Sequence, residues 1–76
     1  MRIKVTLHSA LRGRLPPDAK GRTELDVPAG GSLNDAVLQL GIPDVLYAVN
    51  GSIERNLTRP LRDGDQIDVF IRAAGG

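Results

Sequence analysis

Alternating apolar and polar positions indicate the strands of this chain. Residues 1–7 place Ile3, Val5 and Leu7 on one face and charged or polar side chains on the other, which is the period of a half-buried strand. Residues 23–27 and 66–71 show the same period, with Ile67, Val69 and Ile71 expected on the core face of the latter. The apolar run 45–49 indicates a more fully buried strand, and Asn50-Gly51 after it predicts a tight hairpin into a short return strand at 52–54.

A helical period occurs once, over residues 33–40. Its apolar stripe consists of Leu33, Ala36, Val37 and Leu40, spaced at i, i+3, i+4 and i+7. Ser32 is a good N-cap, and Asp35 three residues later completes a capping-box pattern. Gly41 followed by Pro43 predicts the C-terminal stop. We expect a capped helix lying on a sheet.

The connections show weaker patterns. Residues 8–22 contain Pro16-Pro17 and predict mainly a surface connection, with one helical turn at Ala10-Leu11-Arg12. His8 has no acidic or nucleophilic partner at a telling spacing, so we expect a solvated residue at a strand end. The segment 55–60 is irregular, with Leu57 and Leu61 expected to fill the core beneath it, and 63–65 predicts a tight turn.

The order of these elements predicts an α+β fold, a mixed sheet of four to five strands packed on one main helix. The first and last strands are expected to lie side by side and parallel at its centre. The domain would then comprise residues 1–71, and a flexible tail, 72–76, would leave the sheet directly after the last strand.

Composition narrows the function classes. The chain has 76 residues, a net charge of +1 and no apolar run long enough to span a bilayer, so neither nucleic acid nor membrane is favoured as a partner and we expect a cytoplasmic protein. It has no cysteine and one histidine, which argues against disulfides, thiol chemistry and a conventional zinc site, so no metal is expected. A small core without a nucleophile–base pair makes an enzyme the least favoured class.

The candidate chemistry lies at the C-terminus, which reads Arg72-Ala73-Ala74-Gly75-Gly76. Two glycines can enter a channel too narrow for a Cβ atom and present an unhindered carbonyl to a nucleophile; the alternative is a frayed end. Phe70 falls on an outward position just before this tail. It is either a packed ring under a loop or an anchor for a partner that grips the tail.

Several short motifs follow one another in an order that is typical of one protein family. They are the opening strand with Leu7 and Leu11-Arg12, Leu25-Asp26-Val27-Pro28-Ala29-Gly30, Leu40-Gly41-Ile42-Pro43, Val49-Asn50-Gly51, Pro60-Leu61-Arg62-Asp63-Gly64-Asp65 and Gly75-Gly76. With them the chain resembles the MoaD/ThiS family of ubiquitin-like β-grasp sulfur carriers, which includes the small subunit of molybdopterin synthase and the thiamine-pathway sulfur carrier. The resemblance covers nearly the whole chain.

The resemblance implies a function and a set of partners. A ubiquitin-activating-type enzyme would use ATP to adenylate the Gly76 carboxylate, and a sulfur donor protein would convert it to a thiocarboxylate for a downstream synthase or sulfur acceptor. No cofactor would be bound by the chain itself. Gly75, Ala74 and Ala73 would thread the tail into the enzyme, and Phe70 with Arg72 would help to dock it.

The resemblance leaves the pathway and two alternative functions open. The tail lacks the proline typical of molybdopterin synthase subunits, whereas the proline-bearing segment after the first strand is closer to that type. The same tail would suit a ubiquitin-like modifier joined to target lysines through Gly76. A noncovalent ubiquitin-like binding module, in which the glycines are incidental, is the third possibility.

Overall fold

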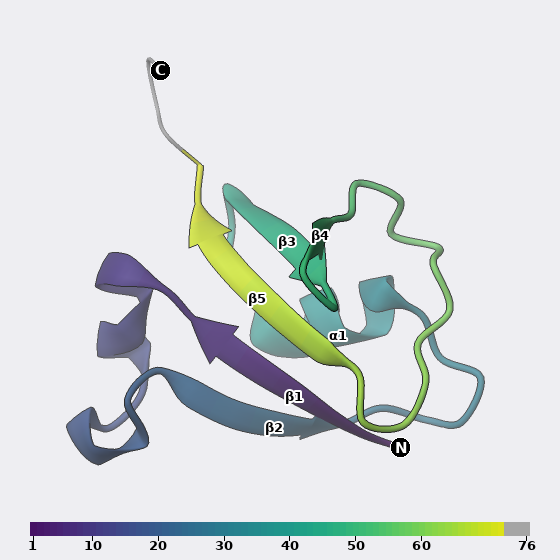
Figure 1. Ribbon diagram of the computed structural model, residues 1–76, viewed down its shortest axis with the longest axis horizontal. Coiled ribbons are helices and arrows are strands. Elements are labelled where there is room, and N and C mark those ends of the chain that lie inside the picture. The colour runs from purple at the N-terminus through teal and green to yellow at the C-terminus, as the bar shows by residue number, and fades with distance from the viewer. Residues whose placement is uncertain (73–76) are drawn as a thin grey trace.

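A computed structural model describes residues 1–72 of the chain, and its elements follow the predicted order (Figure 1). The strands are β1 (Arg2–Leu7), β2 (Arg22–Asp26), β3 (Val45–Val49), β4 (Ser52–Ile53) and β5 (Gln66–Ile71), and the helix is α1 (Leu33–Leu40). The long connection after β1 contains two short 3₁₀ helices, η1 (Ser9–Arg14) and η2 (Pro17–Ala19). The predicted strands and helix are therefore confirmed.

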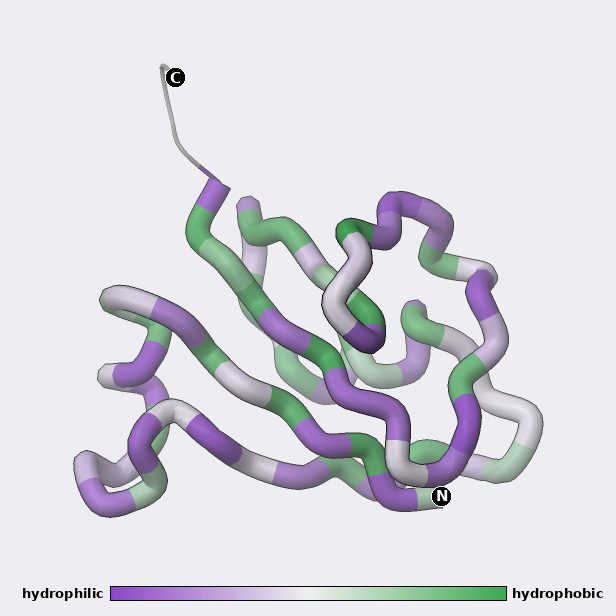
Figure 2. Tube along the Cα trace, in the orientation of Figure 1, coloured by the Kyte–Doolittle hydropathy of each residue, from purple (hydrophilic) through white to green (hydrophobic). Residues whose placement is uncertain are grey.

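The five strands form one mixed sheet in the order β2-β1-β5-β3-β4. The central pair, β1 and β5, is parallel, and every other pair is antiparallel. Helix α1 lies behind this sheet in Figure 1 and covers one of its faces. In Figure 2 hydrophobic and hydrophilic colours alternate along β1 and the first part of β5, the period expected when successive side chains point to opposite faces of a sheet.

The hydrophobic core lies between α1 and the covered face of the sheet. Its most deeply buried side chains are Ile3, Val5, Val27, Leu33, Val49, Ile67 and Val69. The apolar stripe of α1 meets this face as predicted, and Ser32 with Asp35 forms the capping box, in which the backbone N–H of Ser32 donates to an Asp35 carboxylate oxygen at 2.7 Å. Gly41 ends the helix with φ of +62°, a conformation that glycine adopts without strain.

Two apolar residues expected in the core are exposed instead. Leu61 is buried as predicted, but Leu57 is 40% exposed and Ile71 is 47% exposed. Ile71 is the last residue of β5 and pairs with Val45, the first residue of β3. Little of the domain continues past this pair to cover it, so alternation alone overestimated its burial.

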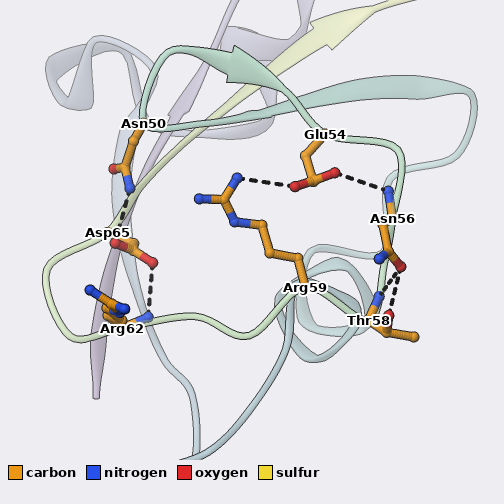
Figure 3. Close-up of polar contacts among 7 residues, drawn as sticks. All are labelled: Asn50, Glu54, Asn56, Thr58, Arg59, Arg62 and Asp65. Atoms are coloured by element: carbon orange, nitrogen blue, oxygen red, sulfur yellow. Dashed lines mark hydrogen bonds and ion pairs between the residues drawn. The ribbon is translucent and has the colours of Figure 1, made fainter.

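Polar side chains, rather than Leu57, hold the irregular segment between β4 and β5 (Figure 3). Arg59 donates to Glu54 at 3.0 Å, and the hydroxyl of Thr58 donates to the Asn56 side chain at 2.6 Å. The bond from Arg59 holds the pKa of the Glu54 carboxyl below its usual range. This segment is therefore fixed by local hydrogen bonds at the surface.

A second polar group ties the end of the same segment to the β3–β4 hairpin (Figure 3). Asp65 accepts from the Asn50 side chain at 3.1 Å and from the backbone N–H of Arg62 at 2.8 Å. Burial by itself would raise the pKa of Asp65, but the bonds from Arg62 and Asn50 outweigh it and hold the pKa below its usual value. The predicted turn at 63–65 is thereby confirmed and anchored.

Candidate functional site

The candidate site begins where β5 ends. Because β5 lies between β1 and β3, the strand that leads to the tail is held by hydrogen bonds on both sides. At its end the backbone N–H of Arg72 lies 3.4 Å from the carbonyl oxygen of Asp44, and the Arg72 side chain is exposed. The predicted tail residues Ala73, Ala74, Gly75 and Gly76 lie outside the described residues.

Phe70 occupies the sheet face opposite α1, as its outward position predicted. It pairs with Leu46 of β3, so both side chains lie on this face. Its ring stacks on the imidazole of His8, with centroids 4.5 Å apart and planes at 10°. Phe70 is half-buried, so it is packed on one side without lying in the core.

His8 is more than the solvated strand-end residue that the sequence suggested. Its Nε2 lies 2.9 Å from Oδ1 of Asp68, an acidic partner 60 residues away in the chain. The parallel pairing of Leu7 with Val69 places His8 next to Phe70, and the backbone N–H of His8 donates to the Val69 carbonyl at 3.1 Å. Sequence spacing could not show this contact, because it depends on the register between the first and last strands.

Two other apolar side chains lie on the same sheet face as Phe70. Leu46, Ile53 and Phe70, which we call the tail-base patch, come from β3, β4 and β5. Ala48 pairs with Ile53 on one side and Asp68 on the other, which assigns Ile53 to the same face. Ile53 is 53% exposed. The first two strands instead present charged residues here, such as Lys4 and Glu24.

Within residues 1–72 no three His, Asp or Glu side chains are grouped as a metal site would require. Tyr47 is buried beneath the sheet face, and its burial raises the pKa of the phenol, which disfavours a role as a proton-transfer group at neutral pH. Across the described part of the chain, no helix has both the length and the apolar character needed to cross a membrane.

A mixed five-stranded sheet with a central parallel pair and one covering helix is the architecture of ubiquitin-like β-grasp proteins. The family model described as "ThiS family" matches residues 16–76. The chain therefore belongs to the ThiS family, within the wider MoaD/ThiS group. No curated protein sequence matches it.

Solved structures share the fold at low sequence identity. A molybdopterin converting factor subunit 1 from Pyrococcus furiosus is 21% identical with a TM-score of 0.78, over 95% of this chain and 98% of that one. The small archaeal modifier protein 1 of Haloferax volcanii is 15% identical with a TM-score of 0.76, over 100% of both chains. A chain from the complex of subunits 1 and 2 of the Helicobacter pylori molybdopterin-converting factor is 24% identical with a TM-score of 0.61, again over 100% of both chains.

Proposed function

We propose that this protein is a sulfur carrier whose cargo is held on the carboxylate of Gly76. The observation that carries the proposal is that the family match extends through residues 75 and 76, so the Gly-Gly pair belongs to the matched region. The absence of cysteine from the sequence leaves no thiol on the chain to hold sulfur. A carboxylate is then the natural attachment point.

The proposed chemistry takes two steps on a partner enzyme. We place this protein and that enzyme in the cytosol. The Gly76 carboxylate attacks the α-phosphate of ATP, forming an acyl adenylate and releasing pyrophosphate. A hydrosulfide equivalent from a sulfur donor then attacks the carbonyl; the carbon–sulfur bond forms, AMP leaves and a thiocarboxylate remains. Glycine favours the second step because no Cβ atom shields the carbonyl. The chain has no active site in this scheme and acts as a carried substrate.

The domain contributes the position of the tail and a surface for docking. Because β5 is paired with β1 up to Val69 and with β3 up to Ile71, the start of the tail is fixed to the domain. The tail-base patch lies next to this point, and exposed Arg72 follows it directly. We infer that Phe70 acts as the apolar anchor and Arg72 as the charged contact for the activating enzyme.

The sulfur acceptor stays open among molybdopterin, thiamine and related biosynthesis. The fold is shared with a subunit that forms a complex with a second subunit in Helicobacter pylori, which supports a synthase-like partner as one possibility. The chain would then be the small, non-catalytic subunit of that assembly.

A ubiquitin-like modifier is the second candidate. Small archaeal modifier proteins from two organisms share this fold, and a lysine amine could attack the same adenylate in place of sulfur. A noncovalent binding module is the third, and it would use the same surface without activating Gly76.

Intact mass spectrometry tests these three functions directly. The full chain is incubated with an activating enzyme, MgATP and a sulfide source, beside a reaction without ATP. We expect an ATP-dependent mass gain of one sulfur replacing one oxygen, mapped to Gly76. Gly13→Ala is a matched control, because a Cβ atom added at Gly13 would have no heavy atom within 4 Å and the variant should be loaded normally.

The other outcomes separate the alternatives. A covalent adduct with lysines of another protein, lost on deletion of Gly76, would favour the modifier. No mass change with an enzyme that activates a known carrier would refute both activated functions and leave the binding module.

A further inference from the structure

Among the described residues, no other strand covers one edge of the first part of β3. Hydrogen bonds from Asn50 to Gln66 and from Arg72 to Asp44 show that the even-numbered residues of this region face β5. Since N–H and C=O groups alternate between the two sides of a strand, Val45 and Tyr47 direct theirs away from β5. Strand β4 pairs with Ala48 and Val49 only, and the chain then leaves the sheet (Figure 1).

Three backbone groups on this edge lack a partner within residues 1–72. The Tyr47 carbonyl accepts from the Glu54 N–H at 2.8 Å, which is the last bond on that side. Within residues 1–72 no hydrogen bond reaches the N–H of Tyr47 or the N–H and C=O of Val45 on this edge. Backbone groups near apolar side chains gain free energy when another strand satisfies them.

The edge borders a hollow of about 280 Å³ with apolar and basic walls. Val45, Leu46 and exposed Leu57 supply the apolar part, and Arg55 and Arg72 the basic part. Neither arginine side chain forms an ion pair within the described residues. Glu54, the acidic residue in the lining, is already paired with Arg59.

We propose that the free edge of β3 at residues 45–47 binds an extended, acidic segment of a partner protein as an added strand. The unpaired backbone groups would bond to the partner's main chain, an apolar partner side chain would enter the hollow, and flanking carboxylates would meet Arg55 and Arg72. Pairing of two copies through this edge is disfavoured, because it would bring the arginines of both copies together. The inference does not depend on the chemistry at Gly76.

A titration with synthetic peptides tests the proposal on the full, isotopically labelled chain. The probe is acetyl-Asp-Val-Thr-Val-Glu-Val-Asp-amide, and the control replaces each acidic residue with lysine. We expect the acidic peptide to shift the amide signals of Val45, Tyr47 and Glu54 with a dissociation constant below about 1 mM, and to bind about tenfold more tightly than its lysine counterpart.

Two further peptides test whether the main chain makes the contact. One peptide is N-methylated at its odd-numbered residues and the other at its even-numbered residues. Each therefore loses the N–H donors of one edge and keeps those of the other. Strand addition predicts that one methylated peptide loses binding and the other keeps it, because only one edge pairs with β3. Arg55→Glu should weaken the acidic peptide several-fold, whereas Arg14→Glu, an equal charge change at an exposed position in η1, should not.

Several results would overturn the proposal. They are no binding at millimolar peptide, equal binding of the acidic and lysine versions, equal binding of both methylated peptides, and shifts centred on Phe70 instead of Val45. Shifts at residues 45–47 that depend on protein concentration alone would show that a second copy occupies the edge. The titration needs no activating enzyme, so this inference and the sulfur-carrier proposal can fail separately.

Discussion

Replacing Phe70 with alanine separates the two roles that its position allows. The ring is half-buried and stacks on His8. Truncation removes about 100 Å² of buried apolar surface, or about 2.5 kcal/mol at about 25 cal/mol per Å². Loss of the stacked pair adds about 0.5–1.5 kcal/mol. We expect the free energy of unfolding to fall by about 3–4 kcal/mol, which a domain of ordinary stability survives.

The second effect of Phe70→Ala is on partner binding. If the ring is an anchor, the affinity of the folded protein for its activating enzyme should fall by about 1–3 kcal/mol, or roughly 5- to 150-fold. Chemical denaturation gives the folded fraction, and calorimetric titration of the enzyme gives the dissociation constant. Each affinity is then corrected to the concentration of folded protein.

The matched control is His8→Ala, which removes the stack and the Asp68 contact but keeps the Phe70 ring. It should lower the free energy of unfolding by about 0.5–1.5 kcal/mol and weaken enzyme binding less than Phe70→Ala does. If Phe70→Ala destabilises the domain while the affinity per folded molecule stays at the wild-type value, the ring is a packing element and the anchor assignment is wrong.

Three further predictions concern the tail, a turn and pH. Gly76→Ala should block thiocarboxylate formation yet leave the melting temperature nearly unchanged, because the core is built within residues 1–72; a large thermal shift would contradict this. Gly31→Ala should cost about 1–3 kcal/mol in a denaturant titration, because its Cβ would lie 2.5 Å from Cγ1 of Val27; wild-type stability would show that the turn relaxes freely. The pKa values of Glu54 and Asp65 are lowered in the folded protein, so both carboxylates stabilise the fold at a pH above their unfolded-state pKa values. The free energy of unfolding should therefore drop as the pH falls below about 4.5. Combined Glu54→Gln and Asp65→Asn substitutions should flatten that pH dependence.

Local patterns predicted the elements because their causes are local. The capping box of Ser32 and Asp35 and the glycine stop at Gly41 involve residues a few positions apart, so the sequence places α1 at the correct bounds. The Asn50-Gly51 turn is equally local: φ is +50° and +88° at these residues, which suits a two-residue hairpin.

Features that depend on several strands meeting were missed. The contact of His8 with Asp68 and Phe70 requires the parallel register of β1 against β5. Leu57 and Ile71 are exposed because too few other segments pack over them. The alternation of residues along one strand does not show which segments will pack over it. The outward position of Phe70 was predicted from the sequence, but its stacking on His8 was not.

The sequence by itself determined the elements, their order, the single capped helix and the glycine pair on which the proposed chemistry rests. Each follows from side-chain periodicity, turn preference or composition over short distances. Only the tertiary structure decided which side chains surround the base of the tail and which edge of β3 stays unpaired. Both depend on strand register and on the short length of β4, and these are set by packing between segments far apart in the chain.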